Sequence, residues 1–201
     1  MYNLNDEGFN AKQGVTIFND GNAGLVNDVK MSVYKKTKED KENAPDYKVT
    51  FTDSSGGEVS SSYWYATKDT QYSTIEEQAR KQGKSMKHII HAVYGASFEI
   101  PFIAKSPKEL LDMSMKCIKD GLASTPSKFR IFATYGTLNS VKNYIQPRSW
   151  VPFVESMNTS EDATRLKLAP TIDAMARVEE SQPVLQDAKA DDLMDTSGDD
   201  W

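Results

Sequence analysis

The chain has 201 residues, of which 38% are hydrophobic, 26% are charged and one is a cysteine. This length predicts one domain, or one domain with an appendage, and the low apolar content indicates that part of the chain lies outside a packed core. A single cysteine excludes a disulfide framework and most cysteine-based metal sites. It is typical of a reducing compartment. No run of 18 apolar residues is present and the N-terminus is polar, so we expect a cytoplasmic protein with no membrane partner.

Charge is distributed unevenly along the chain. Residues 1–157 hold 20 Lys and Arg against 18 Asp and Glu, a net charge of +2, whereas residues 158–201 hold 4 against 11, a net charge of −7. Ser, Thr, Asp, Glu and Ala dominate the second part, which is typical of a disordered segment. The sequence therefore predicts a folded domain over residues 1–157 and a flexible acidic tail for protein interaction over residues 158–201.

Alternation of apolar and polar residues predicts several half-buried strands. The pattern is strongest from Val29, and Gly56 and Gly57 lie in a sequence typical of a hairpin turn. We also expect a short strand at residues 14–18 and a turn at residues 19–22. The other expected strands cover residues 29–34, 47–52, 59–65, 128–135, 141–146 and 150–154.

The middle of the chain changes to helical periodicity. Ser73 or Thr74 can cap a helix that runs to about Tyr94, with Gly83 as a weak point. A second helix begins at Ser106, followed by Pro107 and Glu109 in a capping-box pattern, and we expect Gly121 to end it. The resulting fold class is α+β and mainly antiparallel β: an OB-like barrel with two inserted helices and a disordered acidic C-terminal tail.

The polar faces of the predicted strands indicate a binding surface. They combine cations with exposed aromatic rings, which is what single-stranded nucleic acid needs: cations follow the phosphates and rings stack on unpaired bases. An ordinary solvated sheet face is the alternative, since Lys and Thr are common there. The predicted DNA contacts are Lys30, Tyr34, Lys48, Trp64, Lys128, Arg130 and Phe132, with Arg148 and Trp150 in second rank.

The end of the chain combines acidic residues with a terminal aromatic ring. A solubilising tail explains the aspartates but gains nothing from an exposed indole. A tryptophan beside its own α-carboxylate and two aspartates suits docking, because the ring can fill an apolar pocket while basic residues hold the carboxylates. The predicted partner-binding residues are Asp191, Asp192, Asp195, Asp199, Asp200 and Trp201.

A β-rich body followed by this tail resembles the bacterial and bacteriophage single-stranded-DNA-binding proteins, most closely the phage replication type, whose tail ends in acidic residues and an aromatic. The Asp–Ile-Pro-Phe ending of the bacterial type is missing here. The resemblance implies sequence-independent binding of single-stranded DNA in replication, recombination or repair, within the host cytoplasm for a phage protein. It also implies that the tail recruits a polymerase, helicase or primase. DNA versus RNA preference and homo-oligomer formation stay open.

Signs of an enzyme or a metal site are weak. His88 and His91 lie three residues apart on one predicted helix and Cys117 lies on the next, without a fourth ligand at a matching spacing. The sequence contains no phosphate-binding loop and no hydrolase or metalloprotease motif. We therefore expect no enzyme activity and no cofactor. The alternative function is a protein–protein adaptor or virion assembly component that docks through its acidic tail and never binds nucleic acid.

Overall fold

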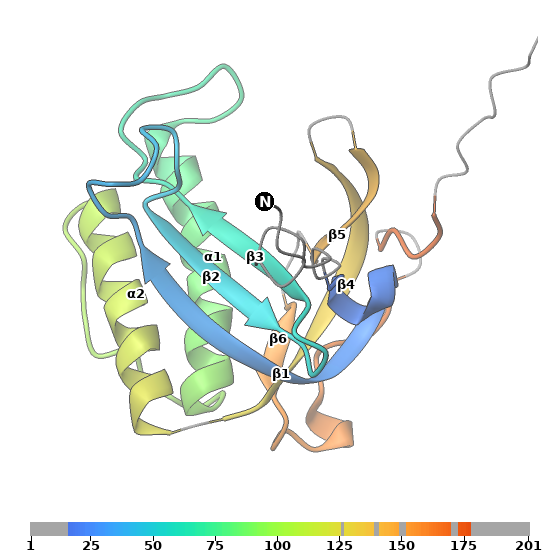
Figure 1. Cartoon of the computed structure of the whole chain (residues 1–201). Helices are drawn as coiled ribbons and strands as arrows, with labels where there is room; N and C mark the ends of the chain where they lie inside the picture. Colours follow the sequence, from blue (N-terminus) through green and yellow to red (C-terminus); the bar gives the residue numbers. More distant parts are fainter. Residues whose placement is uncertain (1–15, 126, 139–140, 149–151, 170–172, 178–201) are drawn as a thin grey trace, which may run out of the picture.

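The computed structural model describes residues 16–125, 127–138, 141–148, 152–169 and 173–177. Six strands and two α-helices make up the fold, which confirms the expected α+β class (Figure 1). The strands are β1 (Gly24–Lys35), β2 (Tyr47–Thr52), β3 (Glu58–Tyr63), β4 (Phe129–Leu138), β5 (Val141–Pro147) and β6 (Val154–Ser156). The helices are α1 (Ile75–Tyr94) and α2 (Pro107–Ser124), and short 3-10 turns cover Phe18–Gly21 and Glu161–Ala163.

The sheet is antiparallel and is organised around β1. The strand order is β3-β2-β1-β4-β5, and β6 pairs with β4. β1 therefore pairs with β2 through its second half and with β4 through its first half. The two ends of this order, β3 and β5, contact each other, although no ladder joins them within the described residues. The observed sheet is open and strongly curved.

A bulge divides β1 into these two halves. The pairing of β1 with β4 shifts register between Val26 and Val29, and Asp28 has a positive φ of 58°. Because of the bulge, Val26 and Val29 both point into the core although they are three residues apart. A period of 2 cannot include both, so the sequence pattern found the strand only from Val29 onward.

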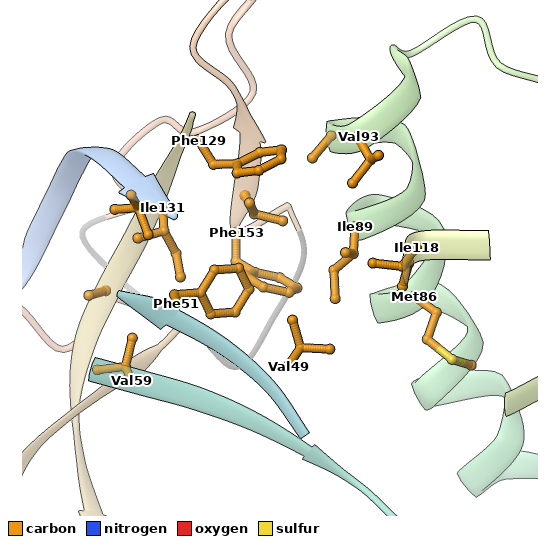
Figure 2. Close-up of a cluster of buried hydrophobic side chains, with 14 of the residues drawn as sticks. Val49, Phe51, Val59, Met86, Ile89, Val93, Ile118, Phe129, Ile131 and Phe153 are labelled. Carbon is orange, nitrogen blue, oxygen red and sulfur yellow. The ribbon is translucent and has the colours of Figure 1, made fainter. Parts of the chain in front are cut away.

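The hydrophobic core lies between the inner face of the sheet and the two helices. Figure 2 shows Val49 and Phe51 of β2 facing Met86 and Ile89 of α1, with Ile118 of α2 beside them. All five of these side chains are at most 1% exposed. Burial of such side chains contributes about 1.5–3 kcal/mol each, so this contact determines which face of β1, β2 and β3 is left to solvent.

Both helices begin where their caps predict. Thr74 forms a complete capping box with Glu77, and Ser106 accepts a hydrogen bond from the Glu109 amide with Pro107 at the first helical position. The Glu109 carboxylate accepts from the Lys105 amide instead of returning to Ser106, so the second cap is not the predicted box. Gly83 does not interrupt α1.

The predicted end of α2 at Gly121 is wrong, since the helix continues to Ser124. Gly121 is buried where α2 crosses α1. A Cβ atom at this position would lie 2.5 Å from Val93 Cγ1 and 2.6 Å from Tyr94 Cζ. The missing side chain is what lets the two helices approach, so this glycine serves packing and not termination.

The folded body continues past the predicted boundary at residue 157. Arg148 and Asp173 are both fully buried and form an ion pair of 2.9 Å, and Arg148 also donates to Lys167 O at 2.8 Å. Further along, the Tyr135 amide donates to Ala174 O. The described residues after β6 thus pack on β4. The predicted tail from residue 178 onward lies outside the described residues, as do residues 14 and 15 of the expected first strand. Residues 16–18 of that strand form no strand, because Phe18 begins a 3-10 turn.

Replacing Gly121 by Ala should lower the free energy of unfolding by about 1–3 kcal/mol, because the new methyl group overlaps Val93 and Tyr94. Gly83 provides the matched control on α1. Its added Cβ would meet Leu110 at an ordinary 3.5 Å, so Gly83→Ala should raise stability by about 0.5–1 kcal/mol through helix propensity. Urea unfolding of both variants measures the difference, and equal effects would contradict the close packing of Gly121.

Replacing Asp173 by Ala should lower the free energy of unfolding by about 3–5 kcal/mol, because Arg148 would be left as a buried charge without this carboxylate. Asp162→Ala, on the exposed 3-10 turn, is the control and should change stability by less than about 0.5 kcal/mol. A small effect of Asp173→Ala in thermal or urea unfolding would show that the segment around residue 173 does not belong to the folded body.

Candidate nucleic-acid interface

The candidate interface is the side of β1, β2 and β3 that faces away from the core, here called the outer face. The strand register aligns its residues in three rows across the strands. Trp64, the residue after β3, continues the alternation outward because Tyr63 and Tyr65 turn inward. The rows are Lys30–Thr52–Glu58, Ser32–Thr50–Ser60 and Tyr34–Lys48–Ser62.

The third row, with Trp64 beside it, brings together the aromatic rings and the cation that were predicted to bind a single strand. Tyr34 lies directly opposite Lys48, and Lys48 lies opposite Ser62, two residues before Trp64. Tyr34 is 45% exposed and Trp64 is 50% exposed, which leaves both rings accessible to a planar ligand. One sheet end therefore carries two exposed rings and one cation in a short span.

Trp64 is held by contacts on both sides of its backbone. Its carbonyl accepts from Gln82 Nε2 of α1 at 3.0 Å. The following amide, of Tyr65, donates to Asp46 Oδ2 at 2.7 Å. These bonds fix the main chain while Trp64 stays 50% exposed, which is compatible with a stacking residue.

Asp112 of α2 anchors this end of the sheet from the inside. Its carboxylate accepts hydrogen bonds from Tyr47 Oη at 2.6 Å, Tyr65 Oη at 2.7 Å and Lys108 Nζ at 2.6 Å. Burial alone raises the pKa of Asp112, but the hydrogen bonds from Lys108, Tyr47 and Tyr65 outweigh it and hold that pKa well below its usual range. Burial, followed by the bond to the carboxylate, raises the pKa of Tyr47 and Tyr65 to about 12.

The loop between β1 and β2 fixes Tyr34. Its hydroxyl donates to the Asp40 carboxylate, which also accepts from the Thr37 amide at 2.7 Å and from Thr37 Oγ1 at 2.9 Å. The bond to Asp40 raises the pKa of Tyr34. The loop thus sets the orientation of the ring without covering it.

The structure corrects the prediction that β4 extends the exposed surface. Phe132 is 4% exposed and lies under the Arg148 guanidinium, 3.7 Å from its ring centroid. Arg130 forms an ion pair with Glu155 and donates a hydrogen bond to Thr159 O. Lys128 is exposed but paired with Asp28 at 2.8 Å. Arg148, Glu155 and Thr159 engage this part of β4, which the sequence pattern did not reveal.

Of the second-rank contacts, Arg148 is buried in its pair with Asp173, where burial lowers the pKa of the guanidinium and Asp173 acts against the shift. Trp150 and all six predicted tail residues lie outside the described residues. Glu58, which was not considered in the sequence prediction, also lies on the outer face and accepts from Thr52 Oγ1 at 3.3 Å. The outer face therefore carries Lys30 and Glu58 in the same row at one end and Lys48 at the other.

His88 and His91 lie on one side of α1 and are both partly buried. Burial, and then the nearby charges of Arg165 and Lys87, lower the pKa of His88; His91 is shifted in the same direction by burial and the same charges. Burial raises the pKa of the Cys117 thiol on α2. Among the described residues, no three His, Cys, Asp or Glu side chains gather as metal ligands would.

A scan against protein-family models, a search of curated proteins and a search of solved structures all found no match to this chain. In the part of the chain that the structure describes, no helix is both long and apolar enough to cross a membrane.

Replacing Asp112 by Asn should lower the free energy of unfolding at neutral pH by about 2 kcal/mol, because two tyrosines and a lysine lose a charged acceptor. Because the folded pKa of Asp112 is depressed, its stabilisation is complete above the unfolded pKa and falls with pH below about 4. The raised pKa values of Tyr47 and Tyr65 add stability that is lost as pH rises from about 10 to about 12. The variant should show a weaker dependence in both ranges.

Asp120→Asn is the matched control, since Asp120 pairs with Lys116 on the same helix at the same spacing and the same 2.6 Å. Asp120 is exposed, so its loss should cost less than about 0.5 kcal/mol. Urea unfolding from pH about 3 to about 11 makes the comparison. Equal losses in the two variants would contradict the anchoring role of Asp112.

Proposed function

We propose that this protein binds single-stranded nucleic acid, with single-stranded DNA as the ligand that the family resemblance favours, on the outer face of β1, β2 and β3. The observation that carries the proposal is the row of Tyr34, Lys48 and Ser62 with Trp64 beside it. Two exposed rings flank a cation on a sheet whose other face is the core.

The chemistry of this row suits an unpaired strand. Every base has a π-face, so stacking on Trp64 and Tyr34 requires no particular sequence. Lys48 offers its charge to a phosphate between the stacked bases. Thr52, Ser60 and Ser62 add hydroxyl groups that can donate to phosphate or sugar oxygens. This arrangement is compatible with sequence-independent binding.

The sheet topology also supports the proposal. The strand order, the contact between β3 and β5 and the curvature around the β1 bulge are those of a sheet that curls toward a five-stranded barrel. We propose that the fold is of the OB type. In OB-folds the face of the second and third strands binds oligonucleotides, and the corresponding face here carries Lys48 and Trp64.

The C-terminal acidic residues that carry the family resemblance lie outside the described residues. Their proposed role, docking of a replication polymerase, helicase or primase through Asp199, Asp200 and Trp201, follows from sequence chemistry. It is independent of the outer face and needs its own binding experiment with such a partner.

Trp64→Ala should weaken binding of fluorescent oligo-dT by about 1–3 kcal/mol, roughly 5- to 150-fold in Kd, because one base loses its stacking partner. Trp64→Phe is the matched control, which keeps a ring and should retain most of the affinity. Tyr34→Ala and Tyr34→Phe form a second such pair. Anisotropy titrations at low salt measure all four variants, with oligo-rU in parallel to compare RNA.

Unchanged affinity of both alanine variants, with the wild-type chain still binding, would remove the outer face from the proposal. If the wild-type chain binds neither oligo-dT nor oligo-rU at low salt, the proposed function is wrong, and the adaptor hypothesis takes its place.

A further inference from the structure

Two hollows lie along the same side of α1. The first, with a volume of about 610 Å³, lies between β3, the α1 residues 81–85 and the end of β5. The second, of about 80 Å³, lies between residues 88–96, which are the end of α1 and the two residues after it, and residues 152–165. Phe153 lines the first hollow and the adjacent Pro152 lines the second, so they follow one another along the helix. We refer to the two hollows together as the α1 groove.

The charged side chains of the α1 groove are mainly cationic. Lys81 and Lys84 line the first hollow and Arg165 lines the second, and all three residues are exposed. Within the described part of the chain, none of the three takes part in a salt bridge. Glu155 is the one acidic residue among the described lining residues, and it already accepts from Arg130, Thr164 and the Arg165 amide.

Neutral hydrogen-bonding side chains also line the two hollows. Ser62, Ser85 and Gln146 line the first hollow, and Ser156 and Thr159 line the second. Hydroxyl and amide groups of this kind donate to phosphate oxygens in nucleic-acid complexes. Burial, and then the charges of Arg165, His91 and Lys87, lower the pKa of His88 beside the second hollow.

The groove begins where the outer face ends. Ser60 and Ser62 belong to the outer face and also line the first hollow. Gln82, another lining residue, donates to the carbonyl of Trp64. From Lys81 to His91 the helix rises by about 15 Å, which is long enough for a few nucleotides.

We propose that the α1 groove holds the sugar–phosphate backbone of the nucleic-acid strand after it passes Trp64 and crosses the edge of β3, with Lys81, Lys84 and Arg165 contacting phosphates. This inference rests on the proposed function, since it extends the strand from the outer face. It assigns α1 a binding role that helical periodicity alone does not indicate.

The test uses the full chain with Lys81→Ala and Lys84→Ala combined. Its control combines Lys105→Ala with Lys119→Ala, which removes the same charge from two exposed residues that line neither the groove nor the outer face. Binding of oligo-dT of about 6 and about 20 nucleotides is titrated across a salt series. Urea unfolding should show that both double variants keep their stability, because all four side chains are exposed.

For the longer oligonucleotide, the groove variant should bind roughly 10-fold more weakly than the control at low salt. The slope of log K against log salt is negative, and its magnitude should decrease by about 1.4, as expected for two lost phosphate contacts on a single strand. The short oligonucleotide, which the outer face can hold by itself, should bind both variants alike. Arg165→Gln should decrease the magnitude of this slope for the longer oligonucleotide by about 0.7.

Equal affinities and slopes of the groove and control variants for the longer oligonucleotide would overturn the inference while the Trp64→Ala effect leaves the proposed function standing. An unchanged slope in Arg165→Gln would overturn the passage through the second hollow. Absence of binding by the wild-type chain overturns the inference and the proposed function together.

Discussion

The bulge in β1 is the constraint on which the rest of the fold depends. β1 has to pair with β2 on one stretch and with β4 on another, and each pairing has to turn apolar side chains toward the same core. A regular strand of this length would pass straight between the two pairings. The positive φ at Asp28 and the shift between Val26 and Val29 bend the strand instead, so that the sheet curves and β3 comes to face β5.

That curvature gives the two halves of the sheet different surroundings. On β4, Arg148 lies over Phe132 and is held there by its buried ion pair with Asp173. Across β1, β2 and β3, the corresponding face stays open at Tyr34 and Trp64. A single curved sheet thus presents one covered polar face and one accessible face, and the accessible one continues over the edge of β3 to α1.

Electrostatics act locally in this protein and not through its total charge. The chain has a net charge of −5, yet Lys48, Lys81 and Lys84 lie close to the exposed edge formed by β3 and α1. Three carboxylates of the body are engaged internally: Asp112 binds two tyrosines and a lysine, Asp40 binds Tyr34 and Glu155 binds Arg130. A polyanion approaching this edge meets Lys48 and the exposed Lys81 and Lys84.

The sequence by itself determined those structural features that depend on residues close together along the chain. Alternation identified β2, β3 and the second half of β1, and the caps at Thr74 and Ser106 identified where both helices begin, because these signals act within a few residues. It also singled out Lys30, Tyr34, Lys48 and Trp64, all of which belong to the outer face. Only the tertiary structure decided which polar faces remain open. Arg130 pairs with Glu155, and Phe132 lies under Arg148, which itself pairs with Asp173. Each of these partners is distant in sequence from the residue that it engages. Gly121 continues a helix for the same reason, since its role depends on Val93 of the other helix. Contacts between segments that are remote in sequence leave no periodic signal. The alternation of apolar and polar residues along the chain therefore cannot predict them.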